Sequence, residues 1–290
     1  MYKVDNAIIL AAGTSSRFAP LSFERPKALI EVCGEVLIER QIRQLKEAGI
    51  DSIYVVVGYK KEQFKYLEDQ FGVILVENDE YLSRNNNASI YVVKDILRNS
   101  YICSSDNYFS ENPFELFVDD SYYSAVYSEG ATNEWCLTMD EDDVIRSVKV
   151  GGEHSWYMLG HTFWSEEFSS KFVEILESVY DLEESKNLLW ESIYMDHLDE
   201  LSMRVRKYAD DVIFEFDTLD ELRKFDVSYV EDSRSQILKD VSKRLHCKEQ
   251  EITNVISFKN DGNEVIGFSF SFRKKIYKYS YLNHMLEKHV

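Results

Sequence analysis

The sequence predicts an α/β protein in which a mixed, mostly parallel sheet is flanked by helices, followed by a small C-terminal helix and β-meander. Short apolar runs alternate with amphipathic segments over the first hundred residues, and strand–helix–strand repetition is typical of a parallel sheet. After about Val230 the pattern restarts with one helix and a series of strands. We therefore expect a main domain at 1–230 and a small α+β subdomain at 231–290.

Continuous apolar runs predict buried strands at 6–10, 52–58, 72–78 and 100–107. Amphipathic segments predict helices at 36–49, 60–71 and 87–97. In the first of these helices, Ile38, Ile42 and Leu45 share one face and Gly49 ends the helix. The carboxyl ends of parallel strands meet at one edge, where ligands bind. We expect residues 13–27, residues 85–89 and Asp106 along that edge.

The middle of the chain changes character. Residues 122–129, 133–150 and 157–164 predict antiparallel strands beside the parallel sheet. Helices at 165–180 and 185–198 each open with a serine suited to N-capping, and a strand at 212–218 precedes a closing helix at 219–230. Beyond it, a helix is expected at 233–246 and three strands within 251–280, with a turn at Asp261–Gly262.

The composition excludes several classes of partner. The net charge is −19, which repels nucleic acid and anionic lipid. The apolar runs are too short to span a bilayer, and the N-terminus lacks the layout of a signal peptide. The four cysteines are scattered and form no CxxC pair. We expect a cytoplasmic protein without nucleic-acid partners or membrane insertion.

The opening loop, "LAAGTSSRFAPLSFERPKAL" at Leu10–Leu29, is far longer than an ordinary strand–helix connection. Gly13 lets the backbone approach a ligand, and the small side chains that follow keep that approach open. The guanidinium of Arg17 can bind phosphate oxygens bidentately, and Lys27 supplies a compact positive charge. The loop matches neither G-x-G-x-x-G nor the P-loop pattern. These features predict a polyphosphate site.

The same loop resembles the signature of sugar-phosphate-type nucleotidyltransferases, and more narrowly of bacterial CTP:phosphocholine cytidylyltransferases. The segments "SDNYF", "TNEW", "GHTFW", "LLWESI" and "FEFDT" follow in that family's order, so the resemblance covers about residues 1–228. It implies a Rossmann-like nucleotidyltransferase fold. It also implies Mg²⁺-dependent transfer from CTP to a phosphorylated small amine, with phosphocholine favoured and pyrophosphate released.

The resemblance assigns roles residue by residue. It implies that Arg17 and Lys27 act on the triphosphate and that Asp106 and Asp217 hold Mg²⁺. The implied nucleotide-binding residues are Leu10, Ala11, Ala12, Gly13, Thr14, Ser15, Ser16, Asn86, Ser89 and Asp106. The implied acceptor-binding residues are Glu134, Trp135, Trp190 and Glu215.

Three of these residues keep a second interpretation. Asp106 at a strand end is also typical of a turn, and Asp217 also suits the N-cap of the helix that begins near Thr218. The run Asn85–Asn87 also suits a polar loop and helix cap.

The acceptor pocket departs from the family in one place. A quaternary ammonium is held by aromatic faces, and Trp135 supplies one, but Leu189 replaces a residue that is often tyrosine in the family. This departure leaves phosphoethanolamine, 2-aminoethylphosphonate or another small phosphorylated amine open as the acceptor. Two further alternatives are a sugar 1-phosphate, which a missing aromatic pocket would support, and a non-catalytic nucleotide-binding regulator, which loss of Arg17, Lys27 or an acidic metal ligand would favour. Trp156 and Trp164 are expected in the core.

The tail weakly resembles the first hairpin of choline-kinase-like phosphotransferases, without their catalytic lobe. We expect it to serve packing or homodimerisation. Because no signature residue lies beyond Asp217, a chain ending near Val230 is expected to retain the reaction.

Overall fold

In the computed structural model, which describes residues 1–260 and 264–289, the contacts divide the chain into two compact units. The first unit contains residues 1–13 and 37–215, and the second contains residues 14–36 and the chain from 216 onward. The sequence placed a boundary near Val230, whereas the contacts group residues 216–230 and most of the opening loop with the tail. The turn expected at Asp261–Gly262 lies outside the described residues.

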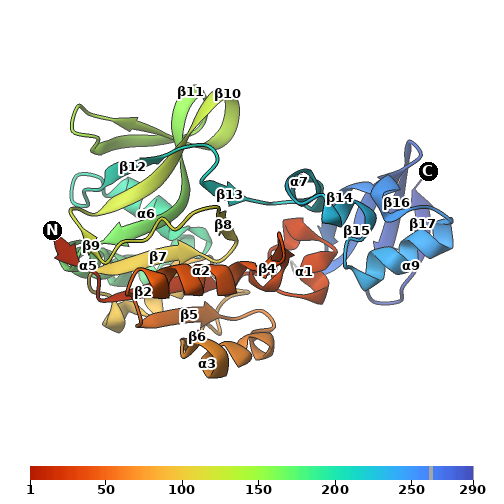
Figure 1. The fold of residues 1–290 in the computed structure, drawn as a ribbon, viewed down its shortest axis with the longest axis horizontal. Helices are drawn as coiled ribbons and strands as arrows, with labels where there is room; N and C mark the ends of the chain where they lie inside the picture. The colour runs from red at the N-terminus through yellow and green to blue at the C-terminus, as the bar shows by residue number, and fades with distance from the viewer. Residues whose placement is uncertain (261–263, 290) are drawn as a thin grey trace. The chain divides into compact units, whose positions relative to one another are not determined.

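The first unit is built on a seven-stranded sheet with the strand order β12-β10-β11-β7-β2-β5-β6 (Figure 1). Its strands are β2 (Asn6–Ala11), β5 (Ile53–Val57), β6 (Ile74–Glu77), β7 (Ser100–Ser104), β10 (Tyr122–Met139), β11 (Ile145–Trp164) and β12 (Arg204–Tyr208). Strands β2, β5, β6 and β7 are parallel, whereas β11 is antiparallel to both β7 and β10. This mixed sheet confirms the predicted fold class.

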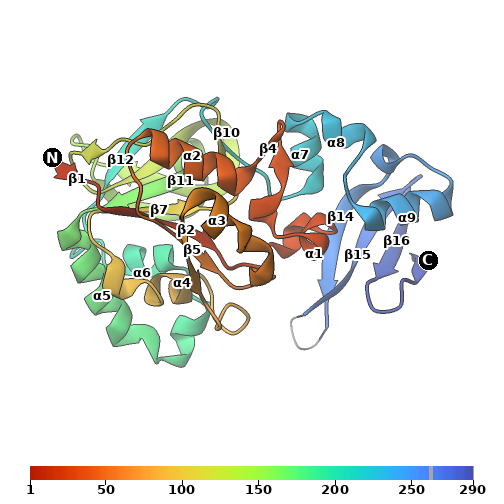
Figure 2. The same ribbon diagram turned by 60° about the horizontal axis from the view of Figure 1, so that its bottom comes forward.

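Helices cover both faces of this sheet (Figure 2). They are α2 (Leu37–Glu47), α3 (Tyr66–Phe71), α4 (Asn87–Tyr91), α5 (Glu166–Tyr180) and α6 (Trp190–Asp196). On one face, Ile8 and Ile102 of the sheet pack with Ile90 of α4, Phe172 of α5 and Trp190 of α6. Helix α2 lies on the opposite face (Figure 2).

Three predicted helices are shorter or divided in the structure. The helix expected at 60–71 divides into a 3₁₀ turn, Lys61–Phe64, and α3. The helix expected at 87–97 ends at Tyr91, and a separate 3₁₀ turn covers Lys94–Ile96. The helix expected at 185–198 divides into a 3₁₀ turn, Glu183–Asn187, and α6, because Leu188 and Leu189 between them are extended. The carbonyl of Leu188 accepts a hydrogen bond from the Asn87 side chain, which holds this interruption in place.

Strand β12 was not predicted, because "RVRKY" has too few apolar residues to suggest a strand. It forms by parallel pairing with the start of β10, Tyr122 facing Arg204 and Val126 facing Tyr208. Pairing across the sheet, rather than local hydropathy, makes this segment extended.

The second unit holds an antiparallel sheet of the order β14-β15-β16-β17. Its strands are β14 (Thr253–Lys259), β15 (Val265–Phe272), β16 (Lys275–Ser280) and β17 (Leu286–His289), and its helices are α1 (Leu21–Glu24), α7 (Leu219–Phe225), α8 (Ser228–Glu231) and α9 (Gln236–Leu245). The predicted helix 219–230 is thus two helices. The predicted meander has a fourth strand, because β17 pairs with β16 despite its charged sequence.

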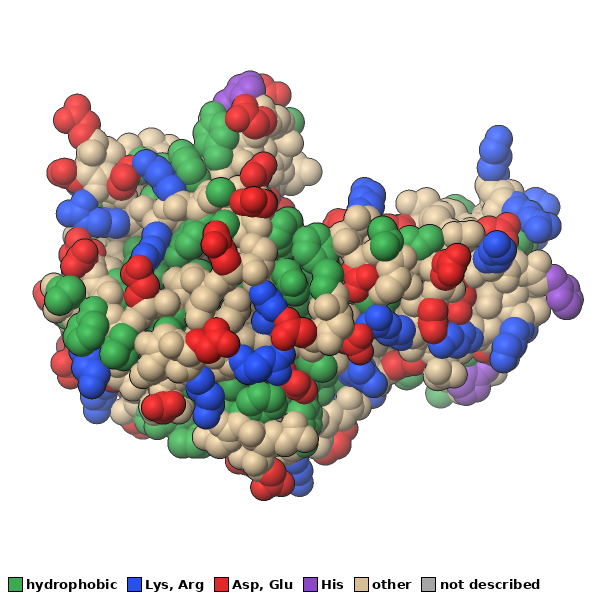
Figure 3. Space-filling view, viewed as in Figure 1, with side chains coloured by type: hydrophobic (Ala, Val, Ile, Leu, Met, Phe, Trp, Pro, Cys, Tyr) green, Lys and Arg blue, Asp and Glu red, His purple; other side chains and the backbone are tan. Residues whose placement is uncertain are grey.

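The surface mixes charges of both signs over the face seen in Figure 3, although the net charge is −19. Within the described part of the chain, no helix combines the length and hydropathy needed to cross a membrane.

Candidate active site

In the first unit, the parallel strands end together at one edge. Leu10 of β2 faces Ser104 of β7, and Ala11 faces Val57 of β5, so Gly13 and Asp106 follow from neighbouring strand ends. A Cβ on Gly13 would meet no atom within 4 Å, so its backbone is approachable, as expected from the sequence.

Ser89 is tied to the same edge. The backbone N–H of Asn78, just after β6, donates to the carbonyl of Val57 at 2.8 Å. The Asn78 side chain donates to the hydroxyl of Ser89 at 3.0 Å, and Ser89 is buried. The first unit therefore gathers Ala12, Gly13, Ser89 and Asp106 along the predicted edge, while Thr14–Lys27 belongs to the second unit.

The side chains of Asn85–Asn87 do not cap their own helix α4 and instead bind the segment that leads into α6. Asn86 stands at the N-cap position of α4 without a side-chain cap bond. Its Oδ1 instead accepts from the N–H of Trp190 at 2.7 Å, and its Nδ2 donates to Glu191 at 3.0 Å. Asn85 N–H donates to the carbonyl of Lys186 at 2.8 Å. The run therefore joins the start of α4 to the segment that leads into α6.

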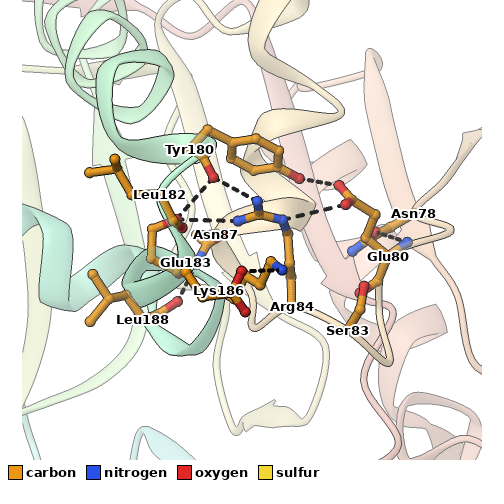
Figure 4. Close-up of polar contacts among 11 residues, drawn as sticks. Asn78, Glu80, Ser83, Arg84, Asn87, Tyr180, Leu182, Glu183, Lys186 and Leu188 are labelled. Atoms are coloured by element: carbon orange, nitrogen blue, oxygen red, sulfur yellow. Dashed lines mark hydrogen bonds and ion pairs between the residues drawn. The ribbon is translucent and has the colours of Figure 1, made fainter.

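Arg84 reinforces this junction, as Figure 4 shows. Its side chain is only 6% exposed, and its guanidinium lies 3.9 Å from the centre of the Tyr180 ring. It donates to the carbonyl of Tyr180 at 2.6 Å and to the hydroxyl of Ser185 at 3.3 Å. Glu80 completes the cluster by pairing with Arg84 at 3.4 Å and by accepting from the Tyr180 hydroxyl. The turn that carries Asn86 is thus held by a buried cation.

The charges of several acidic side chains act on Tyr157 of β11. Burial raises the pKa of the Tyr157 phenol, and the carboxylates of Glu134 and Glu215 raise it further. Glu134 comes from β10, and Glu215 comes from β13 (Ile213–Glu215), which pairs with β8 (Asn107–Phe109). The residue after Trp135, Cys136, faces Tyr157 across the hairpin. Two of the predicted acceptor residues, Glu134 and Glu215, thus act on the same tyrosine.

A second tyrosine, Tyr123, is influenced by Glu215 as well, together with Glu191 and Asp106. Burial is the largest of the causes that raise the pKa of Tyr123 well above its ordinary range. The charges of Glu191 and Glu215 raise it further, and the charge of Asp106 does so more weakly. Burial likewise raises the pKa of Glu191 to about 7, against the lowering effect of its hydrogen bonds to Asn86 and Tyr123. The charges of Asp106, Glu191 and Glu215 therefore all act on one buried tyrosine of the first unit.

Trp190 lies deeper than a direct ligand contact would require. Its side chain is 2% exposed, stacks on Tyr123 with ring centres 5.8 Å apart, and meets the edge of Trp164 at 5.1 Å. In this arrangement it supports the Tyr123 ring from behind. Trp164 is fully buried, which confirms its expected place in the core, while Trp156 is only half-buried beside Tyr127.

The second unit assembles the charged groups of the opening loop. Arg17 Nη1 lies 2.6 Å from Asp217 Oδ2, and Lys27 Nζ lies 3.8 Å from Asp217 Oδ1. Lys27 is 4% exposed and lies 5.6 Å from the centre of the Phe18 ring, whereas Arg17 is 74% exposed. Ser15 adopts a left-handed conformation, φ 46°, as the loop enters the 3₁₀ turn Ser16–Phe18.

The helix that follows Asp217 has its own cap. Thr218 accepts from Glu221 N–H at 3.2 Å, and the Glu221 side chain in turn accepts from Thr218 N–H. Because Thr218 is the N-cap, the Asp217 carboxylate is used for the ion pairs instead. This removes the capping interpretation of Asp217.

The oxygen ligands at these positions suit Mg²⁺ chemically. Among residues 1–260 and 264–289, no group of three His, Cys, Asp or Glu side chains could hold a metal ion. A carboxylate pair that leaves the remaining positions to water and phosphate is the arrangement Mg²⁺ prefers. Asp106 in the first unit and Asp217 in the second each offer carboxylate oxygens of this kind.

The sequence reasoning missed Tyr123, Tyr157 and Glu191. Glu191 directly follows the "LLW" segment, so its position was a usable signal. The two tyrosines had none, because only the pairing of β10 with β11 and the packing of α6 bring them to the acids.

Comparison with known proteins agrees with these features. The MobA-like NTP transferase domain family matches residues 7–102. A choline-phosphate cytidylyltransferase of Streptococcus pneumoniae is 39% identical over 76% of this chain and 96% of its own length. A 2-aminoethylphosphonate cytidylyltransferase of Lancefieldella rimae is 37% identical over 78% of this chain and 93% of its own length.

The fold comparison gives the same picture. A solved structure of CTP:phosphocholine cytidylyltransferase from Streptococcus pneumoniae matches with a TM-score of 0.74 at 39% identity. The match covers 77% of this chain and 97% of that structure.

Proposed function

Since the chain belongs to the bacterial CTP:phosphocholine cytidylyltransferase family, we propose that it joins CTP and phosphocholine to give CDP-choline and pyrophosphate. A phosphate oxygen of phosphocholine attacks the α-phosphorus of CTP. The bond from that phosphorus to the bridging oxygen breaks, and pyrophosphate leaves with the electron pair. Such a transfer depends on positioning and charge neutralisation more than on covalent catalysis.

The opening loop carries the charges that this step needs. Arg17 and Lys27 bind the triphosphate oxygens and neutralise the charge that develops on the leaving pyrophosphate. Lys27 is buried, so its ammonium acts in surroundings where charge is weakly screened. Asp106 and Asp217 would hold Mg²⁺, which supplies further positive charge to the phosphate oxygens when bound.

The observation that carries the choice of acceptor is the 39% identity to a choline-phosphate cytidylyltransferase over 96% of that protein's length. The charges of Glu134 and Glu215, which both raise the pKa of Tyr157, support it. Two carboxylates beside aromatic rings suit an organic cation, and Trp135 adds a ring face. A sugar 1-phosphate has no positive charge to match them. The acids therefore favour an aminoalkyl phosphate.

A second candidate acceptor is 2-aminoethylphosphonate. Leu189 removes one aromatic wall, and Glu191 adds a hydrogen-bond acceptor that a primary ammonium can use but a trimethylammonium cannot. The relative from Lancefieldella rimae bears this substrate in its name.

Pyrophosphate release from CTP with each of four acceptors tests the proposal. The acceptors are phosphocholine, phosphoethanolamine, 2-aminoethylphosphonate and glucose 1-phosphate. We expect the highest kcat/KM with phosphocholine. A higher value with 2-aminoethylphosphonate would replace the acceptor, and a preference for glucose 1-phosphate would overturn the assignment of the acidic pocket.

A further inference from the structure

The C-terminal residues share a compact unit with the opening loop from Thr14 onward. The short helix α1 lies between Arg17 and Lys27 in the sequence, and both ribbon views place it beside the C-terminal sheet (Figures 1 and 2). The loop residues that carry charge are therefore built onto the tail, which the sequence had suggested was dispensable.

Glu24, the last residue of α1, caps the C-terminal helix α9. Its carboxylate accepts from the N–H of Gln236 at 2.9 Å, from the N–H of Ile237 at 3.1 Å and from the Ser235 hydroxyl. The first N–H groups of a helix have no partner within the helix, and its N-terminus favours negative charge. A carboxylate from the loop thus satisfies the first turn of α9.

Two further contacts join the same segments. The rings of Phe23 and Tyr281 stack with centres 3.7 Å apart and planes inclined by 12°. Arg234 lies 3.1 Å from the Glu31 carboxylate, just after the loop. Residues beyond Asp232 thus supply the hydrogen-bond donors to Glu24, the ring that stacks on Phe23 and the cation that pairs with Glu31.

The tail lies outside the family resemblance. The match to the Streptococcus pneumoniae relative spans 96% of that protein but only 76% of this chain. The remaining 24% of this chain lies outside the match. The signature motifs end at about residue 228. In this chain, the family's opening loop therefore packs in one unit with a C-terminal segment that lies outside the family match.

We propose that α9 and the C-terminal sheet hold the opening loop in the shape that binds CTP, with Glu24 as the positioning residue. This rests on the proposed function, because it concerns how Arg17 and Lys27 meet the triphosphate. Loss of the Glu24 carboxylate leaves the N–H groups of Gln236 and Ile237 without that acceptor and releases α1 from α9. The spacing of Arg17 and Lys27 is then no longer fixed.

Steady-state kinetics of the full-length chain test the proposal with Glu24→Ala, Glu24→Gln and Ser165→Ala. Ser165 is the matched control, since its hydroxyl caps α5 in the first unit by accepting from Phe168 N–H at 3.2 Å. We expect Glu24→Ala to lower kcat/KM for CTP about ten- to hundredfold, as misplacement of a binding group does. The KM for phosphocholine stays within about twofold, because the loop acts on the triphosphate. The kcat/KM of Glu24→Gln for CTP lies between those of the wild type and Glu24→Ala. Ser165→Ala changes neither the KM for CTP nor the KM for phosphocholine.

The split between the two KM values separates positioning from lost stability. Fewer folded molecules would lower kcat alone, with both KM values unchanged, and that result would overturn the proposal. So would an equal rise in both KM values or wild-type kinetics in Glu24→Ala. If Glu24→Ala does not fold, Glu24→Gln decides by the same criteria. Should the wild-type enzyme prefer another acceptor, the proposed function fails, and the variants are compared with that acceptor instead.

Discussion

Arg17 and Asp217 form an ion pair with Nη1 and Oδ2 2.6 Å apart, although nearly 200 residues separate them in the chain. The Arg17 side chain is 74% exposed, and exposed ion pairs contribute only about 0–1 kcal/mol. A triphosphate can therefore take over Arg17 at small cost and leave Asp217 available to a metal ion. The pair brings together two residues of the second unit to which the proposed function assigns roles in binding phosphate and metal.

Replacing Lys27 with Ala should lower kcat about 10²–10³-fold, the usual effect of removing one group that stabilises developing charge. The side chain is buried, so no water-exposed cation can substitute for it. Pyrophosphate release measures the loss, and circular dichroism checks the fold. Lys65→Ala, which removes an exposed lysine of the first unit, serves as the control. Wild-type turnover in a folded Lys27→Ala enzyme would contradict the role.

Asp217→Asn should abolish Mg²⁺-dependent turnover, since a neutral amide is a poorer ligand for a hard cation. Asp106→Asn should do the same. Turnover is measured across a Mg²⁺ titration and after exhaustive chelation, with Asp119→Asn, an exposed position, as control. Activity that survives chelation would exclude the metal from the reaction.

Trp135→Ala should raise the KM for the acceptor well above any change in the KM for CTP. A cation–π contact contributes roughly 0.5–2 kcal/mol, which corresponds to a change of about two- to thirtyfold. Trp135→Phe keeps a ring and should retain most of the affinity. If both substrates are affected equally, Trp135 does not belong to the acceptor pocket.

Glu191 should make stability depend on pH in a defined direction. Its pKa is about 7 in the folded chain against an ordinary value of 4.5, so the folded state binds the proton more tightly. The stabilisation is complete below pH 4.5 and is lost as the pH rises through about 7. We expect the free energy of unfolding of wild type, relative to Glu191→Gln, to fall by roughly 2–4 kcal/mol over this interval. Denaturant titrations at several pH values measure the free energy of unfolding of both proteins. The same pH dependence in wild type and Glu191→Gln would refute the raised pKa of Glu191.

A chain ending at Asp232 should lose CTP turnover or fail to fold. It lacks Ser235 and Tyr281, the partners of Glu24 and Phe23. This replaces the expectation, drawn from the motifs alone, that the tail is dispensable. Full activity in a folded truncated chain would restore the earlier view.

The sequence by itself determined the parallel half of the sheet and the charged loop after the first strand. Both features depend on residues that are close in the sequence. Buried strands appear as continuous apolar runs, and Arg17 and Lys27 lie in one loop of unusual length and composition. The family resemblance added Asp217, and the order of its motifs pointed to an aminoalkyl phosphate.

Only the tertiary structure decided which distant residues meet. The side chains of Asn85–Asn87 look like a cap in sequence, yet they bind the chain between Ser185 and Glu191, about a hundred residues away. Trp190 looks like a pocket wall, yet packing against Trp164 buries it. Glu24 looks like a surface acid, yet it caps a helix that begins more than two hundred residues later. Local periodicity carries no information on such pairs, because hydrogen bonds and ring contacts between remote segments arise only when the sheet and helices have assembled.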